Sequence, residues 1–324
     1  MTQQKIDEIY MRRCLQLAVN GRQNAKPNPM VGAVIVSADG RIIGEGYHAR
    51  CGEGHAEVNA FASVRPEDET LLHEATIYVS LEPCSHYGKT PPCADLIIKK
   101  GVRRCVCGCI DPFAKVQGRG IQKIRDAGIE VTVGVLEDEC LELNRRFISV
   151  NTLHRPYVLL KWAQTSNGFL DEMKTDSEGR QVFSPLKISS PFTQILVHKL
   201  RAENDAIVVG RTTDEREHPQ LTVREWVGKN PFRFVLSSDF SIQDLFKMLM
   251  EKSCQSLIVE GGAKTLESFI QSGCYDEIRV ETNTGLYVNE GTPAPQLPSG
   301  LVIVKHEVYG DQVIITYEKE NVNK

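Results

Sequence analysis

Two stretches of the sequence decide how the first half of the chain folds: His55-Ala56-Glu57 and, further on, Glu82-Pro83-Cys84-Ser85-His86-Tyr87-Gly88-Lys89-Thr90-Pro91-Pro92-Cys93. A zinc ion that activates water needs three protein ligands and one open position. One histidine and two cysteines can supply the ligands, and Glu57 then stays free to move protons between water and a substrate. These residues fit a catalytic zinc site; the alternative is that His55, Cys84 and Cys93 are unrelated core residues.

The sequence around these stretches alternates between helical and extended patterns. We predict an amphipathic helix over 5–21, and a hairpin of strands 31–37 and 41–47 around a turn at 38–40. The following elements alternate in type: a helix from about 55, a strand at 75–80, a helix at 93–100, a strand at 104–110, a helix at 118–127 and a strand at 129–135. Helices between strands indicate an α/β sheet with helices on its faces.

A second run of alternating elements follows a break that we expect near 145–156. Strands are predicted at 157–163, 206–210, 232–236, 256–260 and 277–281, with a closing pair at 302–309 and 312–318. Helices are predicted at 191–202, 241–252 and 263–272. The chain therefore reads as two α/β domains, 1–147 and 155–324.

Composition excludes several classes of protein. The 324 residues carry 38 Lys plus Arg and 42 Asp plus Glu, a formal net charge of −4. This mildly acidic balance argues against long nucleic acid as a binding partner. No apolar run approaches the roughly 20 residues that a membrane span needs. The first residues lack the apolar core of a secretory signal, so we expect a cytoplasmic protein.

The ten cysteines do not read as a disulfide scaffold in a chain of this length. Cys105, Cys107 and Cys109 alternate within one predicted strand, which places their side chains on one face of it. We expect these three to be core residues, with metal binding as the alternative.

The motifs of the first half resemble a known family. Zinc deaminases carry H-x-E followed by P-C-x-x-C, although eight residues separate Cys84 from Cys93 here. With Asn28-Pro29-x-Val31-Gly32 upstream, residues 1–150 resemble the deaminase domain of the bifunctional riboflavin-biosynthesis deaminase/reductases. The resemblance implies a cytidine-deaminase-like, three-layer fold and a phosphoribosylated diaminopyrimidinone substrate. It also implies roles for single residues: one Zn²⁺ bound by His55, Cys84 and Cys93, a proton shuttle at Glu57, and substrate contacts at Asn28, His48, Lys89 and Asp111.

The second half carries one informative motif of its own, Leu257-Ile258-Val259-Glu260-Gly261-Gly262. An apolar strand delivers Glu260 to its end, and Gly-Gly lets the backbone turn tightly toward a ligand before a helix begins. Free N–H groups at a helix start favour phosphate. Because the sequence lacks Gly-x-Gly-x-x-Gly, a Rossmann dinucleotide site is not expected.

Further motifs in this half resemble the reductase domain of the same family: Leu160-Lys161, Ile188-Ser189-Ser190-Pro191, His198-Lys199-Leu200-Arg201-Ala202, Val209-Gly210 and Pro219-x-Leu221-Thr222-Val223-Arg224. The resemblance implies a dihydrofolate-reductase-like α/β fold that uses NADPH to reduce a ribosyl ring to a ribityl chain. A substrate phosphate needs fixed cations, for which we choose Arg201 and Arg224. The other implied contacts are Lys161, Ser189, Leu221 and Glu260 for the substrate, and Gln164, Thr213, Glu217, Gly261 and Gly262 for NADPH.

Several alternatives stay open. Glu217-His218 stands where the family usually has Asp-Asn or Asp-Asp, and the segment near 237–242 is shorter than in the family. The chain could therefore be a deaminase with a catalytically degenerate reductase domain. A nucleic-acid deaminase would want aromatic residues beside basic ones, and a structural zinc protein would want a fourth ligand, for which Cys51 is the candidate. The resemblance also implies a homo-oligomer.

Overall fold

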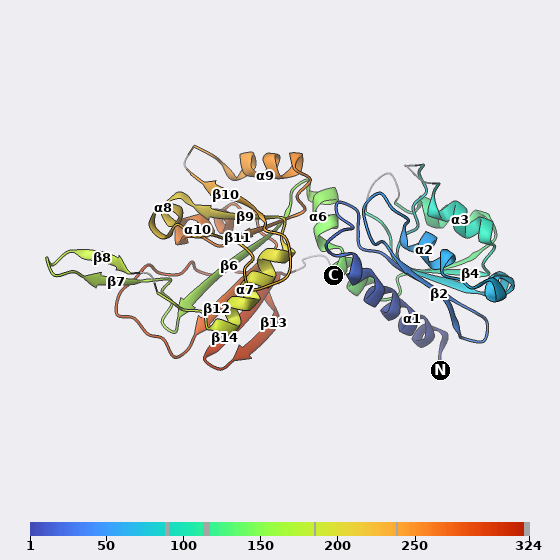
Figure 1. Cartoon of the computed structure of the whole chain (residues 1–324), viewed down its shortest axis with the longest axis horizontal. Coiled ribbons are helices and arrows are strands. Elements are labelled where there is room, and N and C mark those ends of the chain that lie inside the picture. The colour runs from blue at the N-terminus through green and yellow to red at the C-terminus, as the bar shows by residue number, and fades with distance from the viewer. Residues whose placement is uncertain (88–90, 113–116, 185, 238, 321–324) are drawn as a thin grey trace. The chain divides into compact units, whose positions relative to one another are not determined.

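The computed structural model describes residues 1–87, 91–112, 117–184, 186–237 and 239–320 (Figure 1). The chain divides into two compact units, Met1–His154 and Arg155–Lys324. Each unit is built around its own sheet, and the two are described separately below.

The first unit contains a five-stranded sheet in the order β2-β1-β3-β4-β5. Strands β1 and β2 form the predicted antiparallel hairpin, β1 also pairs antiparallel with β3, and β3, β4 and β5 run parallel. The strands are β1 (Gly32–Val36), β2 (Ile42–Tyr47), β3 (Thr76–Leu81), β4 (Arg104–Cys109) and β5 (Glu130–Val133).

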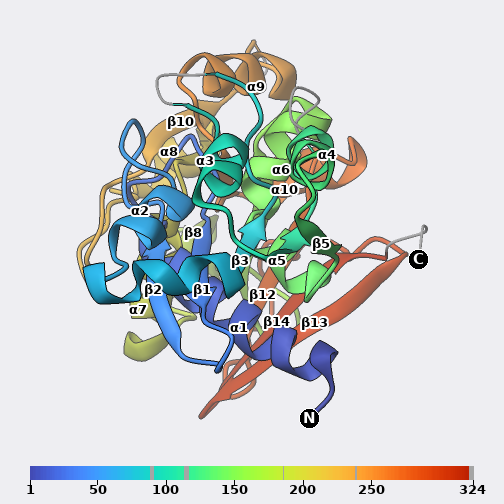
Figure 2. The same ribbon diagram turned by 90° about the vertical axis from the view of Figure 1, so that its right-hand side faces the viewer.

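Helices cover both faces of this sheet. One face packs against α2 (Ala56–Ala62), α3 (Cys93–Lys100) and α4 (Arg119–Asp126), and the other against α1 (Gln3–Ala18) and α5 (Glu137–Leu143). In the view of Figure 2, α3 and α4 lie above β1 and β3, and α1 lies below them. The predicted three-layer architecture is thus confirmed.

Helix α2 lies unusually close to β2 because two glycines leave room for it. A Cβ added at Gly46 would lie 2.3 Å from the backbone nitrogen of Ala60, and one at Gly44 would lie 2.5 Å from the carbonyl oxygen of the same residue. Since His55 is the N-cap of α2 and Glu57 lies in its first turn, this close approach fixes where both side chains stand.

The second unit contains a seven-stranded sheet in the order β10-β9-β11-β6-β12-β14-β13. The first five of these run parallel, and β14 and β13 extend the sheet antiparallel. The strands are β6 (Tyr157–Thr165), β9 (Ala206–Gly210), β10 (Phe232–Leu236), β11 (Ser256–Val259), β12 (Glu277–Asn283), β13 (Leu301–Tyr309) and β14 (Gln312–Lys319).

Helices also cover this sheet on both faces. The larger apolar cluster joins the sheet to α9 (Ile242–Glu251) and α10 (Ala263–Gln271), and a smaller cluster on the other face includes Leu200 of α7 (Pro191–Glu203). Strand β10 and helix α9 are joined by a short segment, and Ser241 begins α9 with a capping box to Asp244. The short joint is therefore compatible with a complete strand and a complete helix.

Some elements were not predicted from the sequence: η2 (Pro66–Glu74), α5, α6 (Arg145–Leu153), α8 (Arg211–Glu217), and the separate hairpin of β7 (Glu172–Thr175) and β8 (Gln181–Ser184). Helix α6 occupies most of the stretch 145–156 in which a break was expected, and the two units divide after His154. The polar residues of that stretch resemble a linker, yet Ser149 of α6 is buried.

The prediction that three cysteines share one face of β4 is also wrong. All three are buried, but Cys105 packs with α2, α3 and α4, whereas Cys109 packs with α1 and α5. Side-chain alternation is lost at this strand end, next to Gly108, where an added Cβ would lie 2.3 Å from Cys140 Sγ. None of the helices in the described part of the chain is long and apolar enough to cross a membrane.

Candidate functional site

The three predicted zinc ligands come together at one point of the first unit. His55 begins α2, Cys93 begins α3, and Cys84 follows β3. His55 Nδ1 lies 3.6 Å from Cys84 Sγ and 3.3 Å from Cys93 Sγ, and all three ligand atoms lie within 4.8 Å of one another. Among the described residues this is the single such group found, and the exposed Cys51 is not part of it.

One of the two cysteines, Cys84, already favours the form that binds metals, whereas a hydrogen bond to Cys84 and burial raise the pKa of Cys93. A hydrogen bond from Cys93 lowers the pKa of the Cys84 thiol to about 4, and the backbone N–H of Cys93 donates to Cys84 Sγ over 3.3 Å. A thiolate is the form of cysteine that binds metals. Burial raises the pKa of the neighbouring Glu57 carboxyl to about 7. Three ligand atoms with a buried carboxyl beside them therefore fit a catalytic zinc site rather than a four-ligand structural one.

A cavity of about 270 Å³ opens beside the cluster, at the carboxyl ends of β3 and β4. Three of the four predicted substrate contacts line it, namely Asn28, His48 and Asp111. Asn28 Nδ2 lies 3.1 Å from His48 Nε2, and His48 Nδ1 lies 3.1 Å from the carbonyl oxygen of Gly54. Burial lowers the pKa of His48, so its ring is held neutral. The fourth predicted contact, Lys89, lies outside the described residues.

Sequence reasoning missed other residues of this cavity. His86, Phe147 and Asn151 line it, the last two from the unpredicted helix α6. Glu82 lines it as well, and its buried carboxylate accepts backbone N–H groups from Asp111, Gly118, Gly120 and Ile121 at 3.3, 2.8, 2.9 and 3.4 Å. The only sequence signal for Glu82 was its place before Pro83-Cys84.

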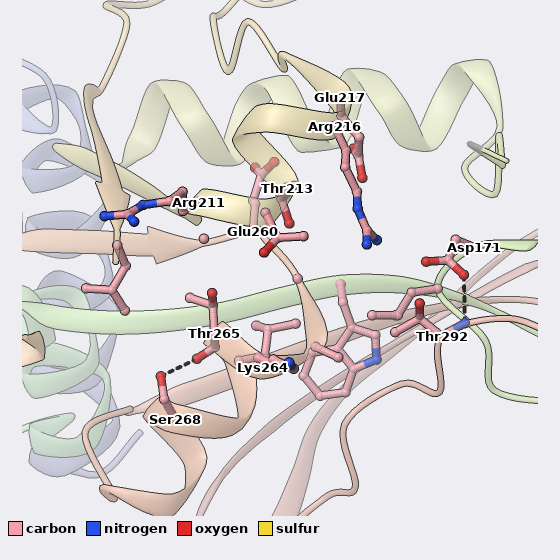
Figure 3. A pocket seen from close by; sticks show the side chains of 18 of the residues that line it. Asp171, Arg211, Thr213, Arg216, Glu217, Glu260, Lys264, Thr265, Ser268 and Thr292 are labelled. Atoms are coloured by element: carbon pink, nitrogen blue, oxygen red, sulfur yellow. Dashed lines mark hydrogen bonds between the residues drawn. The ribbon is translucent and has the colours of Figure 1, made fainter. Parts of the chain in front are cut away.

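The second unit holds a larger cavity, of about 810 Å³, at the carboxyl ends of β9, β10 and β11 (Figure 3). The Gly-Gly turn forms part of its wall. Gly262 has φ +64°, and a Cβ added at Gly261 would lie 2.7 Å from the Cβ of Val209. Helix α10 begins directly after this turn. The volume, the tight backbone and the helix start fit a phosphorylated dinucleotide such as NADPH.

The structure brings several predicted reductase residues together. Lys161, Thr213, Glu217, Glu260 and Gly262 line the large cavity. An adjoining cavity of about 270 Å³ is lined, among others, by Lys161, Ser189 and Arg201.

Arg201, which we chose as a cation for the substrate phosphate, is already paired. Its Nε and Nη2 atoms donate to the two carboxylate oxygens of Glu260 at 3.0 and 2.6 Å, and its Nη1 atom donates to the carbonyl oxygen of Thr222. The charge of Arg201 is therefore already balanced by Glu260.

Other predicted residues lie apart from these cavities. Gln164 lines a separate cavity of about 300 Å³, where its side chain accepts a hydrogen bond from Trp162 Nε1. Leu221 and Arg224 are not among the described residues that line either reductase cavity. Leu221 is buried with φ +54°, and the backbone N–H of Arg224 donates to Nδ1 of the buried His198.

The large cavity also contains charged residues that sequence reasoning missed: Asp171, Arg211, Arg216 and Lys264. Arg211 follows Gly210 at the end of a buried strand, and Lys264 follows the Gly-Gly turn, so their positions gave a usable signal. Asp171 accepts the backbone N–H of Thr292 over 2.6 Å. Its partner is 121 residues away, so no local sequence pattern could have indicated it.

Comparison with known families agrees with this division. Residues 4–109 match the cytidine and deoxycytidylate deaminase zinc-binding region, and residues 156–284 match the RibD C-terminal domain. The riboflavin biosynthesis protein RibD of Aquifex aeolicus is 36% identical over 320 residues, which cover 85% of this chain and 86% of that protein. The RibD of Bacillus amyloliquefaciens is 33% identical, with 91% and 88% covered.

Solved structures of similar proteins superpose on nearly the whole of this chain. The diaminohydroxyphosphoribosylaminopyrimidine deaminase/5-amino-6-(5-phosphoribosylamino)uracil reductase of Thermotoga maritima superposes with a TM-score of 0.86 at 32% identity, covering 98% of this chain and 100% of that one. Acinetobacter baumannii RibD superposes with a TM-score of 0.82 at 26% identity over the same shares. The zinc cluster, the two units and these relatives together show that the chain belongs to the RibD family of bifunctional riboflavin-biosynthesis deaminase/reductases.

Proposed function

We propose that the chain deaminates 2,5-diamino-6-(5-phosphoribosylamino)pyrimidin-4-one in its first unit. In its second unit it then reduces the ribosyl side chain of the product to ribityl. The observation that carries the first step is the grouping of His55, Cys84 and Cys93 within 4.8 Å, beside a cavity that Glu57 lines. The second step is supported by the separate cavity of about 810 Å³ next to the Gly-Gly turn.

In the deaminase step, His55, Cys84 and Cys93 would hold zinc. Zinc, when bound, lowers the pKa of a water molecule so that hydroxide forms near neutral pH. Glu57 would take one proton of the attacking water and pass it to the ring nitrogen, and would then move the second proton, from the hydroxyl of the adduct, to the departing ammonia. The neutral His48, held by Asn28 and Gly54, orients the pyrimidine together with Asp111. Lys89 is proposed as a further substrate contact.

In the reductase step, the cofactor NADPH supplies the hydride. The backbone of Gly261 and Gly262 leaves room for its phosphates, and Thr213 and Glu217, which line the same cavity, are proposed as further contacts to it. The contact of Gln164 stays a prediction, because this residue lines a separate cavity. Substrate would lie in the adjoining cavity, against Lys161, Ser189 and the Arg201–Glu260 pair. Arg224 and Leu221 would approach the substrate from the loop that His198 anchors.

Glu57→Gln tests the deaminase roles. The amide cannot accept a proton, so ammonia release should fall about 100- to 10,000-fold. Because His55, Cys84 and Cys93 are untouched, metal analysis should still find one zinc per chain. Glu53→Gln is the matched control, since Glu53 is exposed and should tolerate the change. Full deaminase activity in Glu57→Gln would contradict the mechanism.

Other expectations stay predictions. We propose that the substrate is a small phosphorylated pyrimidine and that the protein binds neither nucleic acid nor a membrane. We also propose that the protein is a homo-oligomer and is located in the cytoplasm. Light scattering of the purified protein would test the oligomer.

A further inference from the structure

The two reductase cavities share a wall, and this wall sets the direction of the cofactor. Lys161, Ala163, Leu170 and Leu186 line both the large cavity and the adjoining one. If the substrate occupies the smaller cavity, as proposed above, hydride transfer requires the nicotinamide ring at this shared wall. The adenosine half must then extend to the other end of the large cavity.

Figure 3 shows which residues lie at that other end. Asp171, which follows Leu170 in sequence, and Thr292 lie together at one end of the cavity, whereas Arg211 lies at the opposite end. Thr265 and Ser268 of α10 lie on the same side of the view as Arg211. The adenosine end therefore includes the hydroxyl groups of Thr265 and Ser268 and the guanidinium of Arg211.

Arg211 is well suited to a phosphate group. Its guanidinium can bind two phosphate oxygens side by side, with more geometric specificity than an ammonium. Its present partner holds it loosely, because Asp239 lies 3.4 Å away and the two side chains are 52% and 83% exposed. An exposed pair of this kind contributes little stability, so a phosphate can replace Asp239 at small cost.

The other cations that line the cavity are placed differently. Lys161 belongs to the shared wall. Arg216 lies beside Glu217 in Figure 3 and packs over the ring of Phe183 at 5.4 Å. Lys264 is the second residue of α10, next to the Gly-Gly turn, where the cofactor's pyrophosphate would lie.

We infer that Arg211 binds the phosphate monoester on the adenosine ribose of NADPH and so makes the reductase unit prefer NADPH to NADH. This inference rests on the proposed reductase function. Since the two cofactors differ only in that phosphate, the preference depends on a cation at the adenosine end of the cavity.

The test compares nucleotide affinities of the full-length protein by titration calorimetry. Arg211→Ala should weaken NADPH and adenosine 2′,5′-bisphosphate by about 10- to 100-fold, the usual effect of losing a hydrogen bond to a charged group. It should leave NADH and 5′-AMP unchanged. Arg216→Ala is the matched control, because it removes an arginine from the same cavity and should preserve the ratio of the NADPH and NADH affinities.

The outcomes separate two kinds of failure. Equal weakening of NADPH and NADH by Arg211→Ala, or a preference lost in Arg216→Ala instead, would overturn the inference while leaving the reductase function standing. If the wild-type protein binds NADPH and NADH equally well, the inference about Arg211 is also overturned and the proposed reductase function is retained. A wild-type protein that binds neither would overturn the proposed reductase function as well. Wild-type affinities of Arg211→Ala for NADH and 5′-AMP show that the second unit of the variant is folded.

Discussion

A buried carboxylate at the first site holds the backbone around the cavity. Glu82 is 4% exposed, and its two carboxylate oxygens accept four backbone N–H groups from Asp111 and from Gly118, Gly120 and Ile121. A carboxylate satisfied in this way costs little to bury, whereas an unpaired one would be expensive. Glu82 therefore fixes the start of α4 and the backbone of a proposed substrate contact at the same time.

Glu82→Gln should weaken both the fold and the reaction. One side of the amide carries N–H groups that would face backbone donors, so the free energy of unfolding should fall by about 1–3 kcal/mol. The value of kcat/KM for deamination should also fall, because Asp111 loses its support, while the zinc content stays at one per chain. Urea denaturation and ammonia release measure the two effects. Glu139→Gln, which alters only an exposed 3.7 Å ion pair, is the control. Wild-type stability in Glu82→Gln would show that the backbone contacts are unimportant.

At the scale of elements, the contact between β2 and α2 decides where His55, the proposed zinc ligand, and Glu57, the proposed proton shuttle, stand. An added Cβ at Gly46 would also lie 2.5 Å from the carbonyl oxygen of Ala56. Backbone atoms cannot give way as the end of a flexible side chain can. Any side chain at this position must therefore displace the helix that His55 begins.

Gly46→Ala should therefore weaken the metal site, although Gly46 is not one of its ligands. We expect a loss of about 1–3 kcal/mol in the free energy of unfolding, as is usual for overpacking, and weaker zinc binding in a competition assay with a chelator. Gly285→Ala is the matched control, because its nearest neighbour is the end of the Asp311 side chain at 3.3 Å. If Gly46→Ala binds zinc as tightly as the wild type, α2 is not held by this contact.

The elements also show what the sequence could predict and what it could not. Helix α3 lies at its predicted bounds: Pro91-Pro92 precedes it, and Gly101, with φ +64°, ends it. Helix α8 was missed because none of its residues is buried, so no apolar period exists to detect. The hairpin β7–β8 is similarly without a buried residue.

The same contrast holds for the sites. The zinc cluster could be predicted because its residue types and spacing are distinctive. The Arg201–Glu260 pair joins residues 59 apart in sequence, and the backbone contacts of Glu82 span 29–39 residues. Such contacts depend on how strands are ordered in the sheet, which a local pattern does not contain.

At the scale of the whole molecule, the two candidate sites lie in different units. The zinc cluster and its cavity lie within Met1–His154, and both reductase cavities lie within Arg155–Lys324. The two reactions should therefore be separable, since a change in one site leaves the other unit intact. NADPH oxidation by the second unit is what distinguishes the proposed bifunctional enzyme from a deaminase with a degenerate reductase domain.

The most direct measurement follows both reactions at once. Zinc-loaded protein is mixed with the phosphoribosyl diaminopyrimidinone and NADPH, and ammonia release and NADPH absorbance are recorded together. We predict that ammonia appears first and that NADPH is then oxidised in equal amount. Ammonia without NADPH oxidation would contradict the second reaction, and NADPH oxidation without ammonia would contradict the first.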